Sequence, residues 1–354
     1  MDIHALMDLA HEKGAADMHL SVGRRPVFRI GGHLVEVGDA SLQTADTEAL
    51  ARSICPERNW LELQKTGTTD FGFAHKDKCR FRVSVLTQKG MRGLVMRQIP
   101  QKLLTFDQIG LPETCRELLN LHRGLVLVTG PTGSGKTTTL ATMVDWINRN
   151  RDVHIVTIED PIEYYHTHQK SQMTQREVGS DVPTFGEAMR RVLRQDPDVI
   201  LLGEMRDLET TSAAITAAET GHLVFGTLHT TGAARTVDRV IDQYPKEQQE
   251  QIRSQLSLSL VAVISQILLP GASGGRVAAF EVLLNTPAIE NHIRKSETFK
   301  IPSVIQTSRR QGMVLMDDHL MELYREGRIT KDTALEHAFD RKTMATRLGA
   351  PGAD

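Results

Sequence analysis

The feature that most constrains this chain is a glycine-rich loop that stands between an apolar segment and a helical one. The apolar residues 125–129 predict a buried strand, and the spacing of apolar residues over 136–150 predicts a helix. Glycines in such a loop let backbone N–H groups point at phosphate oxygens, and the positive end of the following helix adds to the attraction. The loop and its first helical residues are Gly130, Pro131, Thr132, Gly133, Ser134, Gly135, Lys136, Thr137 and Thr138.

The loop matches the GxxxxGK[ST] pattern in full. We expect Lys136 to reach the β- and γ-phosphates of a nucleotide, and the Thr137 hydroxyl to contact Mg²⁺. A chance glycine-rich turn is the alternative, but it would not explain why a strand and a helix flank the loop as the pattern requires. The sequence therefore predicts a P-loop ATPase with ATP and Mg²⁺ as its cofactors.

A second apolar strand, expected at 199–202, ends in an acidic residue. Ligands of α/β sheets bind at the carboxyl ends of the strands, so this acid is placed near the nucleotide. Many P-loop ATPases carry an Asp-Glu pair here, but in this chain Gly203 occupies the Asp position and only Glu204 remains. We therefore predict that Glu204 polarises the attacking water; the alternative is a solvated loop glutamate.

A third apolar strand, expected at 154–158, is followed by the carboxylates Glu159, Asp160 and Glu163. Because Mg²⁺ keeps much of its hydration, these groups can supply the metal-side charge directly or through water. Glu163 is also a candidate catalytic residue. The alternative is a surface turn made by the Asp-Pro pair that begins at Asp160.

Histidines and arginines complete the list of candidate residues. His222 and His229 flank a strand expected at 223–227, where they can contact the γ-phosphate or bridge neighbouring elements; structural histidines are the alternative. Arg82 and Arg97 lie on strands expected in the first hundred residues. Taken alone they are solvated cations, but an arginine that reaches a neighbour's γ-phosphate can raise the rate by ~10³–10⁵.

The hydrophobic pattern divides the chain into two domains. Residues 1–99 predict a small α+β domain, and residues 113–342 predict a parallel sheet covered by helices on both faces, with a helical C-terminal region. The segment 100–112 is expected to be a linker and 343–354 a disordered tail. The apolar run 256–269 is expected to be a buried helix, because a membrane span needs roughly 20 apolar residues.

Composition and charge argue against nucleic-acid binding, disulfides and a zinc site. The net charge is -2, which gives no support to nucleic-acid binding. The 3 cysteines precede the P-loop and form no CxxC pair, which argues against a disulfide framework and a zinc site. The start of the chain shows no secretory signal, and no segment predicts a transmembrane helix. A cytoplasmic location is therefore expected.

Four ordered motifs give the chain a family resemblance. They are the P-loop, the Ile-Glu-Asp-Pro-Ile-Glu box at 158–163, the Asp-Val-Ile-Leu-Leu-Gly-Glu-Met-Arg-Asp stretch at 198–207, and Thr-Gly-His through His-Thr at 220–230. They resemble the type II/IV secretion ATPase superfamily, and the chain is most similar to its type IV pilus retraction ATPases from residue 1 to about 342.

The resemblance implies more than the residues alone. It implies a PAS-like N-terminal domain, a RecA-like ATPase domain and a homohexamer with nucleotide between adjacent subunits. It also implies coupling to an inner-membrane platform protein, indirect action on pilin, and peripheral association with the inner membrane during pilus retraction and twitching motility. Within the family the acidic and histidine boxes belong to the nucleotide site, and arginines such as Arg82 and Arg97 complete it.

One segment departs from the family pattern. Retraction ATPases carry Ala-Ile-Arg-Asn-Leu-Ile-Arg-Glu, whereas this chain has Ala-Ile-Glu-Asn-His-Ile-Arg-Lys at 288–295. The charge is reversed at Glu290 and Lys295, and His292 replaces a leucine. The alternatives to a main retraction motor are therefore an accessory retraction paralogue or another secretion-type ATPase. A slow nucleotide-gated scaffold and a DNA-handling motor are alternatives of other classes.

Overall fold

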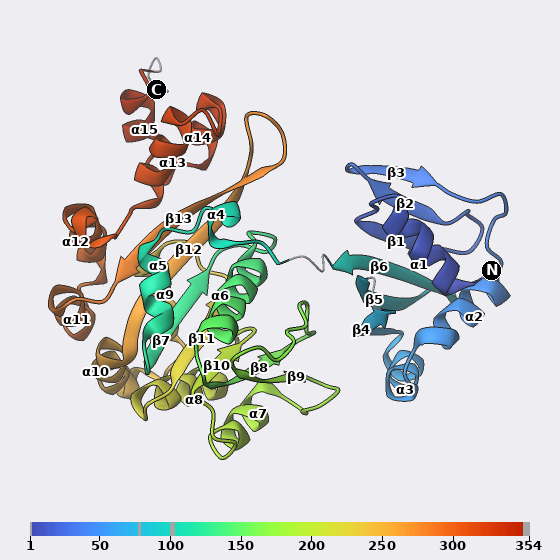
Figure 1. Cartoon of the computed structure of the whole chain (residues 1–354), viewed down its shortest axis with the longest axis horizontal. Coiled ribbons are helices and arrows are strands. Elements are labelled where there is room, and N and C mark those ends of the chain that lie inside the picture. Colours follow the sequence, from blue (N-terminus) through green and yellow to red (C-terminus); the bar gives the residue numbers. More distant parts are fainter. Residues whose placement is uncertain (1, 77–78, 100–102, 350–354) are drawn as a thin grey trace. The chain divides into compact units, whose positions relative to one another are not determined.

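The structure is a computed structural model that describes residues 2–76, 79–99 and 103–349. Its contacts divide the chain into two units, shown in Figure 1. The first contains residues 1–103 with the short segment 161–165, and the second contains 104–160 and 166–354. No helix in the described part of the chain combines the length and apolar character that a bilayer span requires.

The first unit is a six-stranded antiparallel sheet with the strand order β3-β2-β1-β6-β5-β4. Strands β2 and β3 form a hairpin, because Gly31 and Gly32 take φ of +57° and +88°, which the tight turn between them requires. The elements are α1 (Ile3–Glu12), β1 (Asp17–Leu20), β2 (Val27–Ile30), β3 (His33–Glu36), α2 (Thr44–Ile54), α3 (Glu57–Thr66), β4 (Thr68–His75), β5 (Cys79–Gln88) and β6 (Met91–Ile99).

Helices α1, α2 and α3 pack on one face of this sheet. The side chains of Phe81, Val83 and Val85 on β5 are buried in the core that the helices cover. Successive side chains of a strand point to opposite faces, so Arg82 lies on the other face, where it is exposed. The first unit therefore has one apolar, covered face and one face that carries charged groups.

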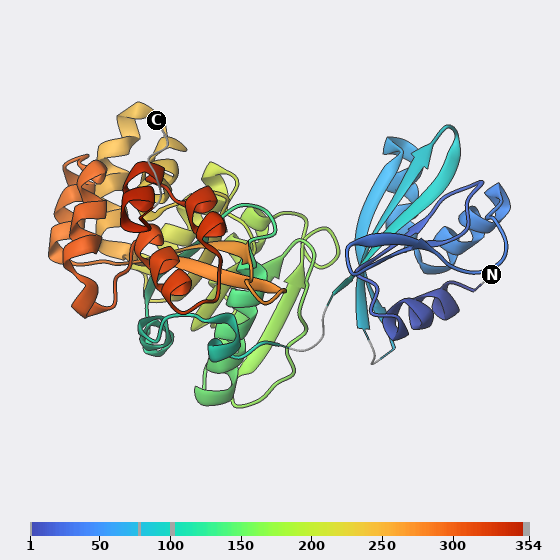
Figure 2. The same cartoon turned by 90° about the horizontal axis from the view of Figure 1, so that it is seen from above.

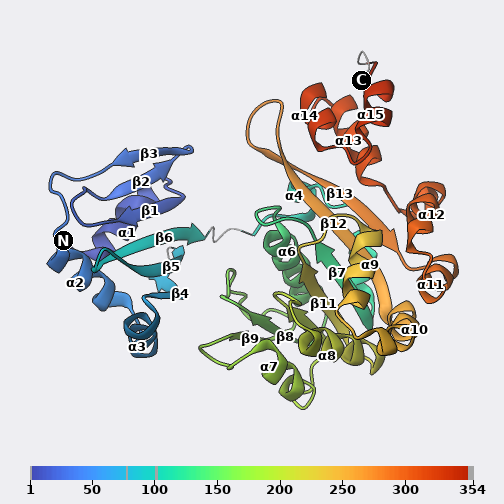
Figure 3. The same cartoon turned by 180° about the vertical axis from the view of Figure 1, so that it is seen from behind.

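The second unit is built on a seven-stranded sheet with the order β13-β12-β7-β11-β10-β8-β9. Neighbouring strands are parallel except for the antiparallel pair β12–β13. Figures 2 and 3 show helices on both faces of the sheet. The strands are β7 (Gly124–Thr129), β8 (His154–Glu159), β9 (Gln172–Glu177), β10 (Val199–Leu202), β11 (Leu223–Leu228), β12 (Leu260–Pro270) and β13 (Arg276–Leu284).

Two apolar clusters fill the two sides of this sheet. One joins it to α4, α5 and α6, and the other joins it to the helices α7 to α12. A third cluster packs α13, α14 and α15 against the β12–β13 hairpin. The helices are α4 (Phe106–Ile109), α5 (Thr114–Glu117), α6 (Lys136–Asn150), α7 (Phe185–Val192), α8 (Leu208–Glu219), α9 (Ala233–Asp242), α10 (Gln249–Ser259), α11 (Pro287–Arg294), α12 (Ile301–Thr307), α13 (Met316–Arg325), α14 (Lys331–His337) and α15 (Arg341–Arg347).

The prediction of a buried helix over 256–269 is wrong. Helix α10 ends at Ser259, and the rest of the run is the strand β12. This strand pairs with β7 along one edge and β13 along the other, and its side chains enter the apolar clusters on both faces of the sheet. A strand buried on both faces is apolar throughout, and periodicity alone does not distinguish it from a buried helix.

Two expected boundaries are also corrected. Residues 104–112 were assigned to a linker, but Phe106, Ile109 and Leu111 are buried in the core of the second unit. The part of that linker at 100–102 lies outside the described residues. The expected tail 343–354 begins inside α15, where Met344 is buried against α13 and its neighbours; residues 350–354 lie outside the described residues.

Candidate nucleotide-binding site

The glycine-rich loop leads from β7 directly into α6, as expected. Its backbone requires glycine at three positions, because Gly130, Gly133 and Gly135 take φ of +144°, +80° and +90°. Two of them also lie close to β12. A Cβ on Gly130 would lie 2.1 Å from the Gln266 carbonyl oxygen, and one on Gly135 would lie 2.9 Å from Gln266 Nε2. The loop is therefore held against its neighbouring strand.

Gln266 is a site residue that the sequence analysis missed. Its side-chain Oε1 accepts a hydrogen bond from Thr139 Oγ1 of α6 at 2.7 Å. It thus supports the first turn of the helix that follows the phosphate loop. The sequence does contain a signal for it, since Gln266 is the one amide in the mostly apolar run 256–269. A buried amide needs a hydrogen-bond partner, so such a residue points to a specific contact.

The loop offers several polar groups to a ligand. Lys136 Nζ donates to the carbonyl oxygens of Gly130 and Pro131, at 2.8 and 3.2 Å, so its ammonium lies over the loop. The Ser134 hydroxyl is buried and has no hydrogen-bond partner among the described residues. Thr137 and Thr138 lie in the first turn of α6, where the backbone N–H groups point towards the start of the helix. These groups fit an anion of the size of a phosphate.

Glu204 lies just beyond β10 and is held by two nitrogen donors. Its Oε1 accepts hydrogen bonds from Arg206 Nε at 2.7 Å and from His229 Nε2 at 3.0 Å. Burial alone would raise the pKa of Glu204, but the hydrogen bond and charge of Arg206, with those of His229, outweigh burial and hold that pKa below its usual range. Glu204 is therefore a carboxylate, as an acceptor of a water proton must be. Arg206 is a partner that the sequence analysis did not identify.

Gly203, at the position where many P-loop ATPases have an aspartate, lies between the ends of two strands. Its N–H donates to the Ile158 carbonyl at 2.8 Å, and its carbonyl accepts from the Thr227 hydroxyl. A Cβ at this position would lie 3.3 Å from the Cα of Glu159, closer than side chains normally approach. The end of β10 thus packs closely against the end of β8 at Gly203, which leaves little room for an aspartate side chain there.

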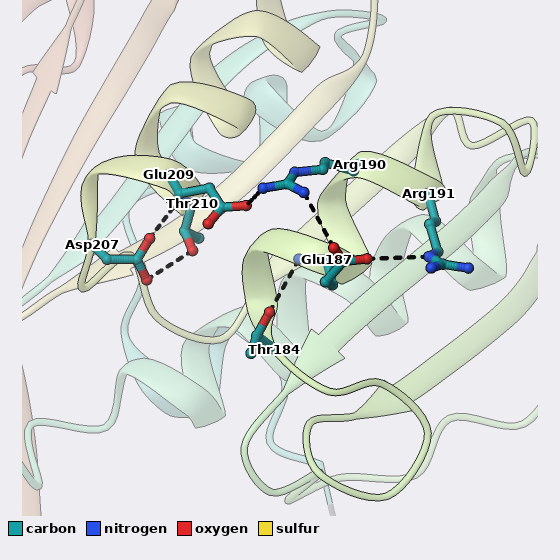
Figure 4. Close-up of polar contacts among 7 residues, drawn as sticks. All are labelled: Thr184, Glu187, Arg190, Arg191, Asp207, Glu209 and Thr210. Atoms are coloured by element: carbon teal, nitrogen blue, oxygen red, sulfur yellow. Dashed lines mark hydrogen bonds and ion pairs between the residues drawn. The ribbon is translucent and has the colours of Figure 1, made fainter.

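The loop that carries Glu204 and Arg206 ends at a helix cap, shown in Figure 4. Asp207 accepts hydrogen bonds from the Thr210 N–H at 2.8 Å and from the Thr210 hydroxyl at 3.0 Å, and so caps α8. Thr184 caps the neighbouring helix α7 through the Glu187 N–H. These caps fix where the two helices begin, and the Asp207 cap limits the movement of the loop that precedes it.

The acids after β8 make separate contacts. Glu159 Oε1 accepts from Thr157 Oγ1 at 2.7 Å and from Gln175 Nε2 at 3.4 Å, while Asp160 is exposed and its charge acts on Arg206. Glu163 lies in the segment 161–165, which belongs to the first unit. Among the described residues, no group of three His, Cys, Asp or Glu side chains could hold a metal. The roles of these acids remain predictions.

The two histidines lie at opposite ends of β11. His229 follows the strand and contacts Glu204, whereas His222 precedes it and its Nδ1 donates to the Ala217 carbonyl at 3.0 Å. Since β11 and β7 are parallel and in register from Leu223 with Gly124 onward, His222 lies at the edge opposite the P-loop. A strand of this length separates its ends by about 20 Å. The structure therefore does not bring His222 to the site of its own chain.

The remaining candidates lie in the first unit. Arg82 is on β5 and Arg97 is directly opposite on β6. Arg97 Nε donates to Asp17 Oδ1 at 2.8 Å. The described residues of the second unit bring together the P-loop, Gln266, Glu204, Arg206 and His229, and the arginines remain candidates on a separate unit.

Comparison with known proteins shows the family of this chain. The family model for type II/IV secretion system proteins matches residues 1–341. The type IV pilus retraction ATPase PilT of Pseudomonas aeruginosa is 47% identical over 338 residues, which is 96% of this chain and 98% of that protein. A twitching motility protein of Neisseria gonorrhoeae is 43% identical over 321 residues, which is 90% of this chain and 86% of that protein.

A solved structure gives the same result for the fold. A crystal structure of the pilus retraction motor PilT with bound ADP matches with a TM-score of 0.91 and 45% identity, covering 97% of this chain and 98% of that chain. The likeness therefore extends over both units of the chain. This chain belongs to the type II/IV secretion system protein family, and within it to the pilus retraction ATPases.

Proposed function

We propose that this chain is an ATP-hydrolysing motor that drives retraction of type IV pili and thereby twitching motility. The observation that carries the proposal is that Glu204, held as a carboxylate by Arg206 and His229, follows β10 in the sheet whose strand β7 ends at the P-loop. A phosphate cradle and a carboxylate that can polarise water are the two parts that hydrolysis of a nucleotide requires.

The loop groups have separate tasks in this proposal. Backbone N–H groups of 130–137 and the Lys136 ammonium bind the β- and γ-phosphates, for which Lys136 leaves the carbonyls of Gly130 and Pro131. The Thr137 hydroxyl, with Glu159, Asp160 and Glu163 directly or through water, would hold Mg²⁺, which neutralises charge on the phosphates. Glu204 orients a water towards the γ-phosphate and accepts its proton.

The proposed site is completed by a second copy of the chain. The first unit is proposed to be PAS-like and the second RecA-like, in a homohexamer with nucleotide between subunits. Arg82 and Arg97 of one subunit would then neutralise the γ-phosphate held by another. His222, at the sheet edge opposite the P-loop, would act at a subunit boundary rather than in its own site. The proposed partner is an inner-membrane platform protein, with pilin reached indirectly from the cytoplasmic side.

An accessory retraction motor is the second candidate, and the segment 288–295 is the observation that favours it. In α11 the apolar residues Ile289 and Ile293 are buried. Glu290 pairs with Arg294 at 4.0 Å, and His292 pairs with Glu297 at 3.1 Å. The departures from the retraction motif thus alter the charged groups of the helix, while its buried residues Ile289 and Ile293 match the motif.

Hydrolysis is tested with the purified full-length protein. The wild type should release phosphate from ATP, and Glu204→Gln should bind ATP but release phosphate at a rate lower by about 100-fold or more. Equal rates for the two proteins would contradict the assignment of Glu204. No phosphate release by the wild type would favour a slow nucleotide-gated scaffold.

Retraction is tested in cells by deleting the gene and imaging labelled pili. Static and overabundant pili support retraction, whereas cells without pili would indicate a role in extension. If pili retract normally until a second retraction ATPase is also deleted, the accessory role is supported. DNA binding at low salt would favour the DNA-handling alternative.

A further inference from the structure

We infer that Asp17 is a positioning residue that holds the guanidinium of Arg97 in place for a phosphate group. The inference rests on the proposed function, in which Arg97 acts on a nucleotide held by another subunit. Asp17 lies on β1 in the first unit, whereas the P-loop and Glu204 belong to the second. Its proposed effect is therefore transmitted through Arg97.

Strand pairing places four charged residues in one row. Asp17 is opposite Arg97 on β6 and opposite Arg29 on β2, and Arg97 is opposite Arg82 on β5. Directly opposed residues lie on the same face of a sheet, about 5 Å apart. The row therefore runs Arg29, Asp17, Arg97, Arg82 across four neighbouring strands, and its formal charge is positive.

Asp17 binds two of these arginines at once. Its Oδ1 accepts from Arg97 Nε at 2.8 Å, and its Oδ2 lies 3.2 Å from Arg29 Nε. The Asp17 side chain is 9% exposed, whereas that of Arg97 is 72% exposed. A buried carboxylate with two charge-assisted contacts is a rigid anchor, while the cation that it holds reaches into solvent.

The atom used for the contact decides what Arg97 can still do. Nε lies at the base of the guanidinium, so a bond there fixes the plane of the group and leaves the Nη1 and Nη2 edge available. That edge is the one that binds two phosphate oxygens side by side. The contact with Asp17 therefore orients Arg97 without using the atoms that phosphate binding needs.

The neighbouring arginine supports a functional reading of the row. Like charges directly opposite each other destabilise a sheet, and Arg82 is opposite Arg97. Asp17 offsets part of this repulsion from the other side. Arg82 and Arg97 are exposed and opposite each other, and the buried Asp17 holds Arg97. This arrangement is suited to a doubly charged anion such as a terminal phosphate.

The first experiment measures ATP hydrolysis by full-length Asp17→Asn. We expect kcat to fall by between about tenfold and 100-fold, because a misplacement of about 1 Å can cost that much, while the KM for ATP stays within about twofold. Glu36→Gln is the matched control, since Glu36, on β3 of the same sheet but outside the row, also pairs with an arginine, Arg24. An unchanged or increased kcat in Asp17→Asn would overturn the inference; an increase would mean that Asp17 restrains Arg97.

A double-mutant cycle separates positioning from a general structural role. In an Arg97→Ala background, Asp17→Asn should lower kcat by less than about twofold, because the group that it positions is gone. A structural role predicts the same loss in both backgrounds, and that result would overturn the inference. Asp17→Glu provides a second variant if Asp17→Asn does not fold; it keeps the charge but moves the acceptor, and should also lower kcat.

The same set of variants distinguishes the inference from the function on which it rests. If Arg97→Ala hydrolyses ATP at the wild-type rate, the proposed role of Arg97 itself is wrong. If Arg97→Ala is slow and Asp17→Asn is normal, only the role of Asp17 is wrong. Thermal unfolding and binding of a fluorescent ATP analogue, both expected to stay near wild type, exclude a loss of fold or of nucleotide affinity.

Discussion

Glu204 Oε1 lies 3.0 Å from His229 Nε2, and this contact joins the ends of β10 and β11. Arg206 also contacts the same carboxylate oxygen, at 2.7 Å. The γ-phosphate side of the proposed site is thus lined by one carboxylate and two nitrogen donors. Movement of either strand end would change the orientation of Glu204.

The contact with Arg206 predicts a pH dependence of catalysis. Arg206 lowers the pKa of Glu204 against the effect of burial, so Glu204 stays ionised in mildly acidic solution. In Arg206→Gln the pKa of Glu204 rises. On acidification Glu204 is then protonated at a higher pH than in the wild type, and the activity that needs its carboxylate is lost there. The acidic limb of the kcat/KM profile should therefore move to higher pH, with a small change near pH 8.

The control for this change is Arg191→Gln, which removes an exposed arginine paired with Glu187 on α7. Its pH profile should match the wild type within the precision of the assay. A profile of Arg206→Gln that coincides with the wild type would show that Glu204 does not act as the base.

The cap of α8 predicts a loss of activity at a distance from the nucleotide. Asp207→Ala should lower the free energy of unfolding by about 1 kcal/mol, since an N-cap is lost. It should also lower kcat, because the loop with Glu204 and Arg206 is then less restrained. Urea unfolding and phosphate release measure the two effects.

Thr184→Ala is the matched variant, because it removes the cap of α7 in the same way. It should cost a similar free energy of unfolding, about 1 kcal/mol, and leave kcat unchanged. Equal losses of kcat in both variants would mean that stability, and not the loop of Glu204, explains the effect of Asp207→Ala.

Close packing at Gly203 predicts that the usual aspartate cannot simply be restored. Because a Cβ there would lie 3.3 Å from the Cα of Glu159, Gly203→Asp should destabilise the protein by about 1–3 kcal/mol. Gly203→Ala should show most of the same loss, which would assign it to the Cβ and not to the charge. Unfolding free energies at or above the wild-type value in both variants would contradict this reading of the packing.

Glu281 on β13 predicts a pH dependence of stability. Its carboxylate caps α9 and α13 by accepting from the N–H groups of Ala233 and Met316. Burial nevertheless raises the pKa of Glu281 above its usual value, so the native state holds its proton to higher pH than the unfolded state. This contribution to stability is complete below the unfolded pKa and is lost as the pH rises through the folded pKa.

The measurement compares urea unfolding of the wild type and Glu281→Gln between pH 4 and pH 8. The wild type should lose stability relative to the variant as the pH rises, by at most about 1.4 kcal/mol per pH unit. A difference that stays constant with pH would mean that Glu281 titrates alike in both states. Because both proteins share all other titrating groups, the difference isolates this carboxyl group.

Much of the site was predictable because its signals are local. The P-loop follows from glycines with positive φ between a continuous apolar strand and a helix, and the structure has both elements at the expected positions. Glu204 was found for the same reason, since it follows an apolar strand by two residues. Local chain geometry alone decides such features, so the sequence is sufficient for them.

Other features required the fold. Periodicity could not separate β12 from a helix, and Gln266 was missed with it because its role depends on pairing with β7. His222 and His229 are similar in sequence context, and only the direction of β11 sends one of them to the site and the other to the opposite edge.

The sequence by itself thus determined that the chain has a phosphate loop, a carboxylate just beyond an apolar strand and the motifs of its family. Only the tertiary structure decided which side chains surround them: Arg206 and His229 on Glu204, Gln266 beside the loop, and Asp17 behind Arg97. The physical reason is that these contacts join residues on different strands or loops. Their distances are set by sheet order and register, which no local pattern of residues specifies.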